Sequence, residues 1–369
     1  MPAGSEPIPI ESVGASAFTI PTDKPESDGT MAWDSTTIVV VEAAAAGRVG
    51  LGWTYASAAA AEMIRGTLAA VVSGGDAIDV AGRWAEMIAA VRNIGRPGLA
   101  SCAVSAVDTA LWDLKARILD VPLAVLLGAV RDAVPVYGSG GFTTYGPAEV
   151  AEQLGDWTQA GIPRVKIKVG REPEQDPPRL DAARSAIGAS GELYVDANGA
   201  FRAKEALRWS ERYVSDHGVS WFEEPVSSDD LEGLRLVRER CPAGLDVAAG
   251  EYGYEIFYFR RMLAAGSVDC LQADVTRCGG YTSFLRVSGL CDAFSTDLSA
   301  HCAPQLSAHA GSAAWHFRHL EYFHDHVRIE RMLFDGVLEP EPGGLLRPDR
   351  GRAGLGLELR RSDARRWAV

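Results

Sequence analysis

The residues of this sequence that could carry chemistry recur at a regular interval through its second half. Each closes a short apolar segment, and neighbouring members are 20 to 28 residues apart. They are Lys168, Asp196, Glu223, Glu251, Asp274, His301 and Glu321. Taken singly, each has a plainer explanation, such as an aspartate that caps a helix or a histidine in the core. Seven ionisable residues at one phase of a repeat are hard to obtain from a solvated surface, so we predict one shared active site.

Three of these residues are carboxylates from successive repeats. Asp196, Glu223 and Glu251 would repel one another in a low-dielectric site, and each would be costly to desolvate. A bound dication removes that cost. A ligand set of oxygens alone favours Mg²⁺, with water or substrate oxygens completing the octahedron. Zinc is not expected there, because it would recruit imidazole or thiolate.

The stretch RVKIKVG (164–170) alternates as a β-strand should. Its valines and isoleucine fall on one side, and Lys166 and Lys168 fall on the other, because successive side chains of a strand point to opposite faces. An edge strand with solvated lysines would show the same pattern. Because of the carboxylates nearby, we expect both lysines to point into the active site. A partly desolvated lysine beside a dication should have a lowered pKa, which would suit a general base.

A second proton-transfer group is predicted across the site. Asp274 and His301 end the sixth and seventh strands, so they can pair. An aspartate hydrogen-bonded to an imidazole fixes its tautomer and raises its basicity. Two candidate acid/base groups would then lie on opposite sides of one metal ion.

The elements that must position these residues alternate between short apolar strands and helical segments from about residue 134 onward. Four helical segments, beginning with PAEVAEQLGDWTQAG, fit between the earlier strands. A strand–helix repeat of about 25 residues is typical of a parallel α/β barrel, whose active site lies at the C-terminal ends of the strands. The eight expected strands are 135–141, 164–170, 192–198, 221–225, 246–251, 270–275, 297–301 and 320–323.

The first third of the chain has a different pattern. Residues 1–35 are rich in Pro, Ser, Thr and Asp, and we interpret them as tail and loop. Strands followed by several helices suggest a separate α+β domain. The expected strands are 35–45 and 47–55, and the expected helices are 57–73, 76–92 and 101–119.

Composition excludes several classes of partner. The formal net charge of −13 over 369 residues argues against a nucleic-acid backbone as ligand. No apolar run approaches the ~20 residues of a membrane span. MPAGSEPIPIESV at the start has no basic residue followed by an apolar run, so we do not expect it to be a secretory signal. Six irregularly spaced cysteines without a CxxC pair fit reduced thiols, so we expect a cytoplasmic protein with a small-molecule substrate.

The motifs KIK, VDAN, FEEP, AAGE, QADVTRCGG and SAH together resemble the enolase superfamily, and specifically its mandelate racemase subgroup. The resemblance spans nearly the whole chain. It implies an α/β fold: a modified TIM barrel, (β/α)₇β, with an N-terminal α+β capping domain. The capping domain would cover residues 1–133, with 1–35 partly tail and specificity loop. The barrel would cover 134–335, and 336–369 would pack back on the cap.

The resemblance also implies roles for individual residues. Mg²⁺ would be bound by Asp196, Glu223 and Glu251. Lys168 would be one acid/base group, and His301 paired with Asp274 the other. Substrate-binding residues would be Lys166 and Glu321 at the substrate carboxylate, Asn198 of the VDAN motif, and Tyr55 and Trp33 from the cap. Relatives are commonly dimers or octamers, so a homo-oligomer is expected.

The shared reaction of that superfamily is abstraction of the proton α to a carboxylate, through a metal-stabilised enediolate. We expect dehydration of a sugar acid to a 2-keto-3-deoxy acid. A racemase or epimerase of a 2-hydroxy acid, using Lys168 and His301 on opposite faces, is the first alternative. Cycloisomerisation is less favoured, because such relatives usually carry lysine on the later strands. A catalytically silent carboxylate-binding barrel would require a broken metal triad or a missing base, and neither is seen.

Six of the seven histidines lie between residues 301 and 326. The HDH stretch (324–326) follows the last expected strand. It could line the active site, form a second metal site, or be a polar loop that caps the next segment.

Overall fold

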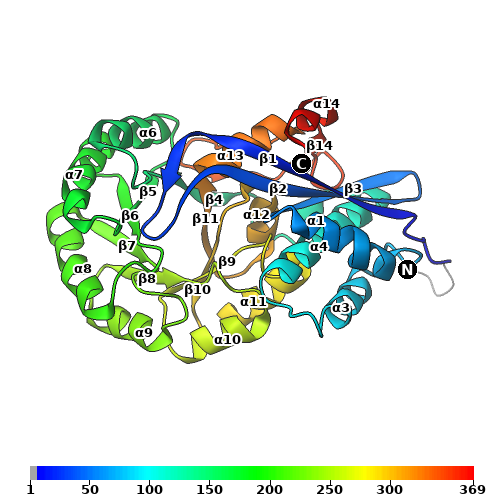
Figure 1. The fold of residues 1–369 in the computed structure, drawn as a ribbon, viewed down its shortest axis with the longest axis horizontal. Helices are drawn as coiled ribbons and strands as arrows, with labels where there is room; N and C mark the ends of the chain where they lie inside the picture. The colour runs from blue at the N-terminus through cyan, green and yellow to red at the C-terminus, as the bar shows by residue number, and fades with distance from the viewer. Residues whose placement is uncertain (1–5) are drawn as a thin grey trace.

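The computed structural model describes residues 6–369, which form a cap and a barrel (Figure 1). The cap sheet is antiparallel, in the order β1–β2–β3. Its strands are β1 (Ser12–Ser27), β2 (Ala32–Ala45) and β3 (Arg48–Tyr55). Helical segments follow: α1 (Ala59–Met63), the π-helical turn η1 (Ile64–Leu68), α2 (Ala69–Val72), α3 (Val80–Ala90), α4 (Leu99–Ile118) and α5 (Leu123–Leu126).

The interpretation of residues 1–35 as tail and loop was wrong for most of that range. Residues 12–27 form β1, which pairs along its length with β2. Two prolines and several polar residues give this segment a loop-like composition. Both features are tolerated because β1 is an edge strand, and because its register shifts between Pro21 and Glu26.

The long buried helix α4 packs directly on β3 because β3 contains glycines at the contact. A Cβ atom on Gly50 would lie 2.3 Å from the carbonyl oxygen of Ala110, and one on Gly52 would lie 2.4 Å from that of Ala106. No side chain fits at such distances. The two glycines therefore set how closely helix and sheet approach.

The barrel contains the eight predicted parallel strands in sequence order, and it closes where β11 pairs with β4. They are β4 (Val134–Gly140), β5 (Arg164–Lys168), β6 (Glu192–Asp196), β7 (Val219–Glu223), β8 (Asp246–Ala249), β9 (Cys270–Ala273), β10 (Asp297–Ala300) and β11 (Phe317–Phe323). The helices between them are α6 (Pro147–Gln159), η2 (Pro173–Gln175), α7 (Asp176–Ile187), α8 (Ala203–His217), α9 (Leu231–Arg240), α10 (Ile256–Ala264), α11 (Gly280–Ala293) and α12 (Pro304–Ala313).

Strand β5 divides its side chains as the sequence predicted. Val165 and Ile167 belong to the large core between strands and helices, whereas Lys166 and Lys168 do not. A separate small cluster fills the space between strands on the other face. Its members are Tyr137, Tyr194, Trp221, Ala248 and Cys270. This packed interior leaves the strand ends as the place for a site.

The β1–β2 hairpin reaches across the barrel toward the ends of β5 and β6 (Figure 1). At its tip, a Cβ atom on Gly29 would lie 2.2 Å from the carbonyl oxygen of Ala197 and 2.8 Å from that of Val169. The Thr143 amide donates to the Ser27 carbonyl at 2.8 Å. The cap therefore closes over the C-terminal ends of the strands.

The C-terminal residues return from the barrel to the cap. The Leu355 amide donates to Asp113 of α4 at 2.6 Å, and Ala368 forms a bridge with Phe18 of β1. No helix among residues 6–369 has the length and apolar character needed to cross a membrane. The elements of this part are α13 (His324–Leu333), β12 (Phe334–Asp335), β13 (Leu345–Leu346), β14 (Glu358–Leu359), α14 (Arg361–Ala364) and η3 (Arg365–Trp367).

Candidate active site

Three carboxylates meet at the ends of adjacent strands. Asp196 ends β6, Glu223 ends β7, and Glu251 follows β8 by two residues. One oxygen from each lies within 4.8 Å of the other two, and all three side chains are buried. Gly250 precedes Glu251 with a φ of 137°, and a Cβ atom on it would lie 2.2 Å from the Gln272 carbonyl oxygen, so no side chain fits there.

The donor set fits a hard dication. Burial and the charge of Asp196 raise the pKa of Glu223 to about 8, so the cluster is unfavourable as carboxylates alone. Glu251 Oε2 is buried and lacks a well-aligned hydrogen bond. All three ligands offer oxygen, as Mg²⁺ prefers. Asp196, Glu223 and Glu251 would therefore hold the ion.

The two lysines of β5 contact this cluster from one side. Lys166 Nζ lies 2.5 Å from Glu223 Oε1 and 2.8 Å from Glu321 Oε1. Lys168 Nζ lies 2.5 Å from Asp196 Oδ2. Both lysines are buried, so neither belongs to a solvated edge strand.

The expected lowering of the lysine pKa is not found among the protein groups alone. Burial lowers the pKa of Lys168, but the charges of Asp196, Glu321 and Glu223 together outweigh burial and hold the pKa above the usual value. The pKa of Lys166 is raised as well, because the charges of the neighbouring carboxylates, Glu223 and Glu321 above all, outweigh the effect of burial. A cation bound by the same carboxylates would weaken this attraction, which is the condition that the expectation assumed.

His301 and Asp274 form the predicted pair on the other side of the cluster. His301 Nδ1 lies 2.8 Å from Asp274 Oδ2. The other oxygen of Asp274 accepts from the backbone amide and hydroxyl of Thr276, at 2.6 and 2.7 Å. A carboxylate held in this way makes Nδ1 the donor and leaves Nε2 free. His301 Nε2 faces Glu251 Oε2 at 3.2 Å.

The protonation of His301 depends on its anionic neighbours. Burial lowers its pKa, but the neighbouring carboxylates of Glu251 and Glu321 hold the pKa above the usual value. Burial raises the pKa of Asp274, and its hydrogen bond to His301, the charges of His301 and Arg277 and the hydrogen bond from Thr276 together hold that pKa below the usual value. A cation bound by Glu251 would weaken the attraction that raises the pKa of His301, as it would for Lys168.

Backbone strain follows His301 directly. Cys302 and Ala303 both have positive φ angles, 49° and 43°, which non-glycine residues adopt at a cost of about 1–2 kcal/mol each. The tight turn brings Cys302 Sγ to 3.3 Å from both His301 Nε2 and Glu321 Oε2. Strain of this kind persists only where the surrounding structure holds it.

A pocket of about 430 Å³ opens over these groups and is lined by both cap and barrel. The predicted substrate-binding residues Trp33, Tyr55, Asn198 and Glu321 all line it, and so do Lys168, Glu251 and His301. Lys166 is not among its lining residues; it lies beneath the carboxylates, fully buried. The structure thus brings the predicted site residues together, although Lys166, Asp196, Glu223 and Asp274 are buried and do not line the pocket.

The cap residues are fixed by contacts with other parts of the chain. The Tyr55 ring stacks on His326, and its hydroxyl donates to Glu330 Oε1 at 3.3 Å. Trp33 Nε1 donates to Glu26 Oε2 at 2.8 Å, and its ring meets Phe142 edge-on.

Sequence reasoning missed several residues at the site. Tyr252, Arg277 and Cys302 line the pocket; His326 also does, which was one of the alternatives left open for the HDH stretch. Glu224 is also buried beside the cluster, and its Oε1 has no hydrogen-bond partner among the described residues. Its backbone has a positive φ of 39°, which the FEEP motif did not predict. Arg277 stands three residues after Asp274, a spacing that could have been noticed.

The interpretation of HDH (324–326) as a polar loop was wrong, because these residues form the first turn of α13. Asp325 lies where the helix dipole favours a carboxylate. Of the two histidines, His326 lines the pocket and His324 points to the β1–β2 hairpin, where it contacts Asp23.

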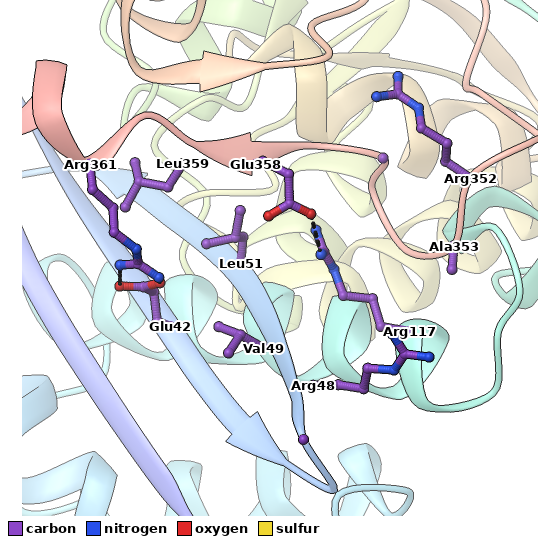
Figure 2. A pocket seen from close by; sticks show the side chains of 12 residues that line it. Glu42, Arg48, Val49, Leu51, Arg117, Arg352, Ala353, Glu358, Leu359 and Arg361 are labelled. Carbon is purple, nitrogen blue, oxygen red and sulfur yellow. Dashed lines mark hydrogen bonds and ion pairs between the residues drawn. The ribbon is translucent and has the colours of Figure 1, made fainter.

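A second hollow, of about 510 Å³, lies between the cap sheet and the C-terminal segment (Figure 2). Two of its arginines have acidic partners across the hollow: Arg361 pairs with Glu42, and Arg117 Nη1 lies 2.8 Å from Glu358 Oε1 (Figure 2). The carboxylate cluster and the His301–Asp274 pair lie elsewhere. This hollow is therefore not the predicted active site.

Comparison with known proteins agrees with this geometry. Residues 18–128 match the family described as mandelate racemase / muconate lactonizing enzyme, N-terminal domain, and residues 149–364 match the family described as enolase C-terminal domain-like. The structure of a mandelate racemase/muconate lactonizing enzyme-like protein from Rubrobacter xylanophilus is 56% identical, with a TM-score of 0.96 over 98% of this chain and 100% of its own.

Two relatives have named activities. The 3,6-anhydro-alpha-L-galactonate cycloisomerase of Streptomyces coelicolor is 33% identical over 85% of this chain and 87% of its own. The L-talarate/galactarate dehydratase of Salmonella typhimurium is 33% identical over 86% of this chain and 79% of its own. The latter has been solved with Mg and L-lyxarohydroxamate, and that structure has a TM-score of 0.89 over 100% of this chain and 95% of its own.

Proposed function

The chain belongs to the mandelate racemase / muconate lactonizing enzyme family of the enolase superfamily and is a Mg²⁺-dependent enzyme, and from its site we propose that it dehydrates a sugar acid. The proposal covers the reaction, the site residues and the class of substrate. The two relatives described above are a sugar-acid dehydratase and a cycloisomerase.

One observation carries the proposal: two proton-transfer groups flank one carboxylate cluster. Lys168 Nζ contacts the Asp196 member at 2.5 Å, and His301 Nε2 contacts the Glu251 member at 3.2 Å. A substrate carboxylate held at the cluster would therefore present opposite faces of its α-carbon to the two groups. Such an arrangement suits abstraction of the α-proton from either face.

The bound Mg²⁺ supplies a Lewis acid that stabilises the negative charge developing on the substrate carboxylate. In our proposal Lys166 adds a fixed positive charge at the same place, because it is buried among Glu223, Glu321 and Asp196. Glu321 is held by Ser139, whose hydroxyl donates to Oε1 at 2.6 Å, and it aids the positioning of the substrate.

Dehydration then needs one base and one acid. The base takes the proton from the α-carbon, and the electron pair of that C–H bond forms the Cα=Cβ bond. The β-hydroxyl leaves with a proton from the acid, so water is released. The resulting enol becomes a 2-keto-3-deoxy acid by moving one proton to Cβ. Lys168 and His301 contact the cluster from opposite sides, so one of them would be the base at the α-carbon and the other would protonate the leaving hydroxyl.

Cycloisomerisation is the second candidate, and it is stronger than the sequence motifs implied. The relative with that activity is as similar to this chain as the dehydratase is. The first step, loss of the α-proton, is shared, and an internal C–O bond breaks in place of the bond to a free hydroxyl. Racemisation would use the same two groups in turn, one to deprotonate and the other to reprotonate.

Proton NMR in D₂O tests the proposal. The protein would be incubated with Mg²⁺ and pools of 2-hydroxy acids, aldonic acids and aldaric acids. A dehydratase should remove the α-proton signal and produce deuterated 3-deoxy methylene signals. Recovery of the opposite epimer would instead indicate a racemase or epimerase. Conversion of a bicyclic anhydro acid or lactone, with acyclic acids untouched, would indicate a cycloisomerase.

A further inference from the structure

A second group of metal-binding side chains lies where the β1–β2 hairpin meets α13. Asp23 and Glu26 lie on β1, and His324 is the first residue of α13. One carboxylate oxygen of each acid and one ring nitrogen of His324 lie within 4.8 Å of one another. Asp23 Oδ2 is 3.0 Å from His324 Nε2, within about half an ångström of the ~3.4 Å between two tetrahedral ligands that lie about 2.1 Å from one ion.

Glu26 supplies an independent sign of a ligand. Its side chain is 0% exposed, and Oε2 accepts the hydrogen bond from Trp33. Oε1 is buried and has no partner within the described residues. A buried carboxylate oxygen without a partner is costly, and native structures satisfy such atoms with protein, water or an ion.

The surrounding charge also favours a cation. Asp325 is fully buried, and its Oδ2 lacks a partner among the described residues. Arg328 is the guanidinium at this place; it pairs with Asp325 Oδ1 at 2.6 Å and donates to the Pro21 carbonyl. Asp23, Glu26 and Asp325 thus place three carboxylates beside one guanidinium.

We propose that Asp23, Glu26 and His324 bind a divalent first-row transition cation, of which Zn²⁺ is the probe used below. An imidazole with two carboxylates suits Zn²⁺ and not Mg²⁺, whose sites are built from oxygen. This separates the second site from the cluster of Asp196, Glu223 and Glu251. Asp23 and His324 remain 46% and 24% exposed at their side chains, which gives the ion access from solvent.

The proposed ion would link the β1–β2 hairpin to the barrel beside the substrate pocket. Trp33 lines that pocket and donates a hydrogen bond to Glu26. A proposed ligand of the ion therefore contacts a residue of the pocket lining directly. Binding of the ion would join β1 to the first turn of α13, whose His326 also lines the pocket.

The test is the zinc content of the full-length protein after equilibrium dialysis against micromolar Zn²⁺ with saturating Mg²⁺. The variants are Glu26→Gln and His324→Gln, and the matched control is His316→Gln. His316 also lies at the surface, 3.0 Å from Asp292, but no third ligand lies near it among residues 6–369. Zinc bound at His301, Cys302 and Glu321 would be the same in all four proteins and cancels from the comparison.

We expect wild type and His316→Gln to retain one more equivalent of zinc than His324→Gln, and Glu26→Gln to bind that equivalent at least about tenfold more weakly. Zinc should also raise the melting temperature of wild type and His316→Gln by more than that of His324→Gln. Equal zinc content in all four folded proteins, or complete displacement of this zinc by Mg²⁺, would overturn the proposal.

Discussion

Asp274 Oδ2 lies 2.8 Å from His301 Nδ1, and this contact determines which ring nitrogen of His301 faces the carboxylate cluster. The same aspartate is anchored by Thr276, so the imidazole is held from behind in one orientation. The geometry makes Asp274 a positioning residue, whereas His301 is the group that would move a proton.

Asp274→Asn should therefore lower kcat by about 100-fold or more, with a smaller change in KM, because an amide cannot stabilise the imidazolium. The pH profile of kcat should shift as well, because His301 loses a nearby negative charge and its pKa falls. The measurement is substrate α-proton loss by NMR across a pH series. An unchanged pH profile would argue that Asp274 has only a structural role.

Mg²⁺ binding should distinguish the two glutamates of the FEEP motif. Glu223→Gln removes a proposed ligand and should weaken Mg²⁺ binding by about 10-fold or more in calorimetry. Glu224→Gln is the matched control, since Glu224 is equally buried and adjacent but lies outside the three-carboxylate cluster. Mg²⁺ affinity that falls with Glu224→Gln and not with Glu223→Gln would reverse the assignment. Removal of Mg²⁺ by EDTA should abolish turnover in the wild type.

Lys166 should matter for stability as well as for chemistry. Lys166→Met would leave Glu223 and Glu321 buried without their cation. Breaking a buried ion pair in this way typically costs about 3–5 kcal/mol. Urea unfolding without Mg²⁺ should show this loss, and added Mg²⁺ should recover part of it by neutralising the same carboxylates. A loss that Mg²⁺ does not change would place the cost in side-chain packing instead.

The strand ends were predictable from sequence because each barrel strand is short, apolar and followed by one ionisable residue. That pattern located Asp196, Glu223 and His301 correctly at the same end of the barrel. Strand β1 was not predictable, since Pro21 and Pro25 are tolerated only because β1 is an edge strand that pairs on one side.

Contacts across the cap–barrel boundary were also beyond the sequence. Tyr55 was expected at the substrate pocket, but its stacking on His326 joins residues 271 positions apart, and no local pattern encodes such a contact. The raised pKa of Lys168 likewise depends on how closely Asp196 approaches it in the folded chain. Periodicity and motif spacing predict the elements and where they end, whereas the distances between elements depend on tertiary packing.

The free energy of unfolding should fall as pH rises because of Asp108, a residue of α4 that contacts the barrel. Its carboxylate accepts hydrogen bonds from the amide and hydroxyl of Thr282 on α11, at 3.0 and 2.6 Å. Burial raises the pKa of Asp108 from 3.8 to about 7 in the folded protein. The folded state therefore binds the proton more tightly than the unfolded state does. The stabilising contribution is complete below about pH 4 and is lost as pH rises through about 7.

Asp108→Asn keeps the shape of the side chain and removes its titration. Between about pH 4 and 7, the free energy of unfolding of the wild type should fall relative to this variant by up to about 1.4 kcal/mol per pH unit. Above that range the difference should level off. Urea unfolding at several pH values measures it, with Asp34→Asn as the control because Asp34 is exposed on the cap. Parallel pH dependences for wild type and Asp108→Asn would show that Asp108 stays ionised in the fold, held by the two Thr282 hydrogen bonds against the cost of burial.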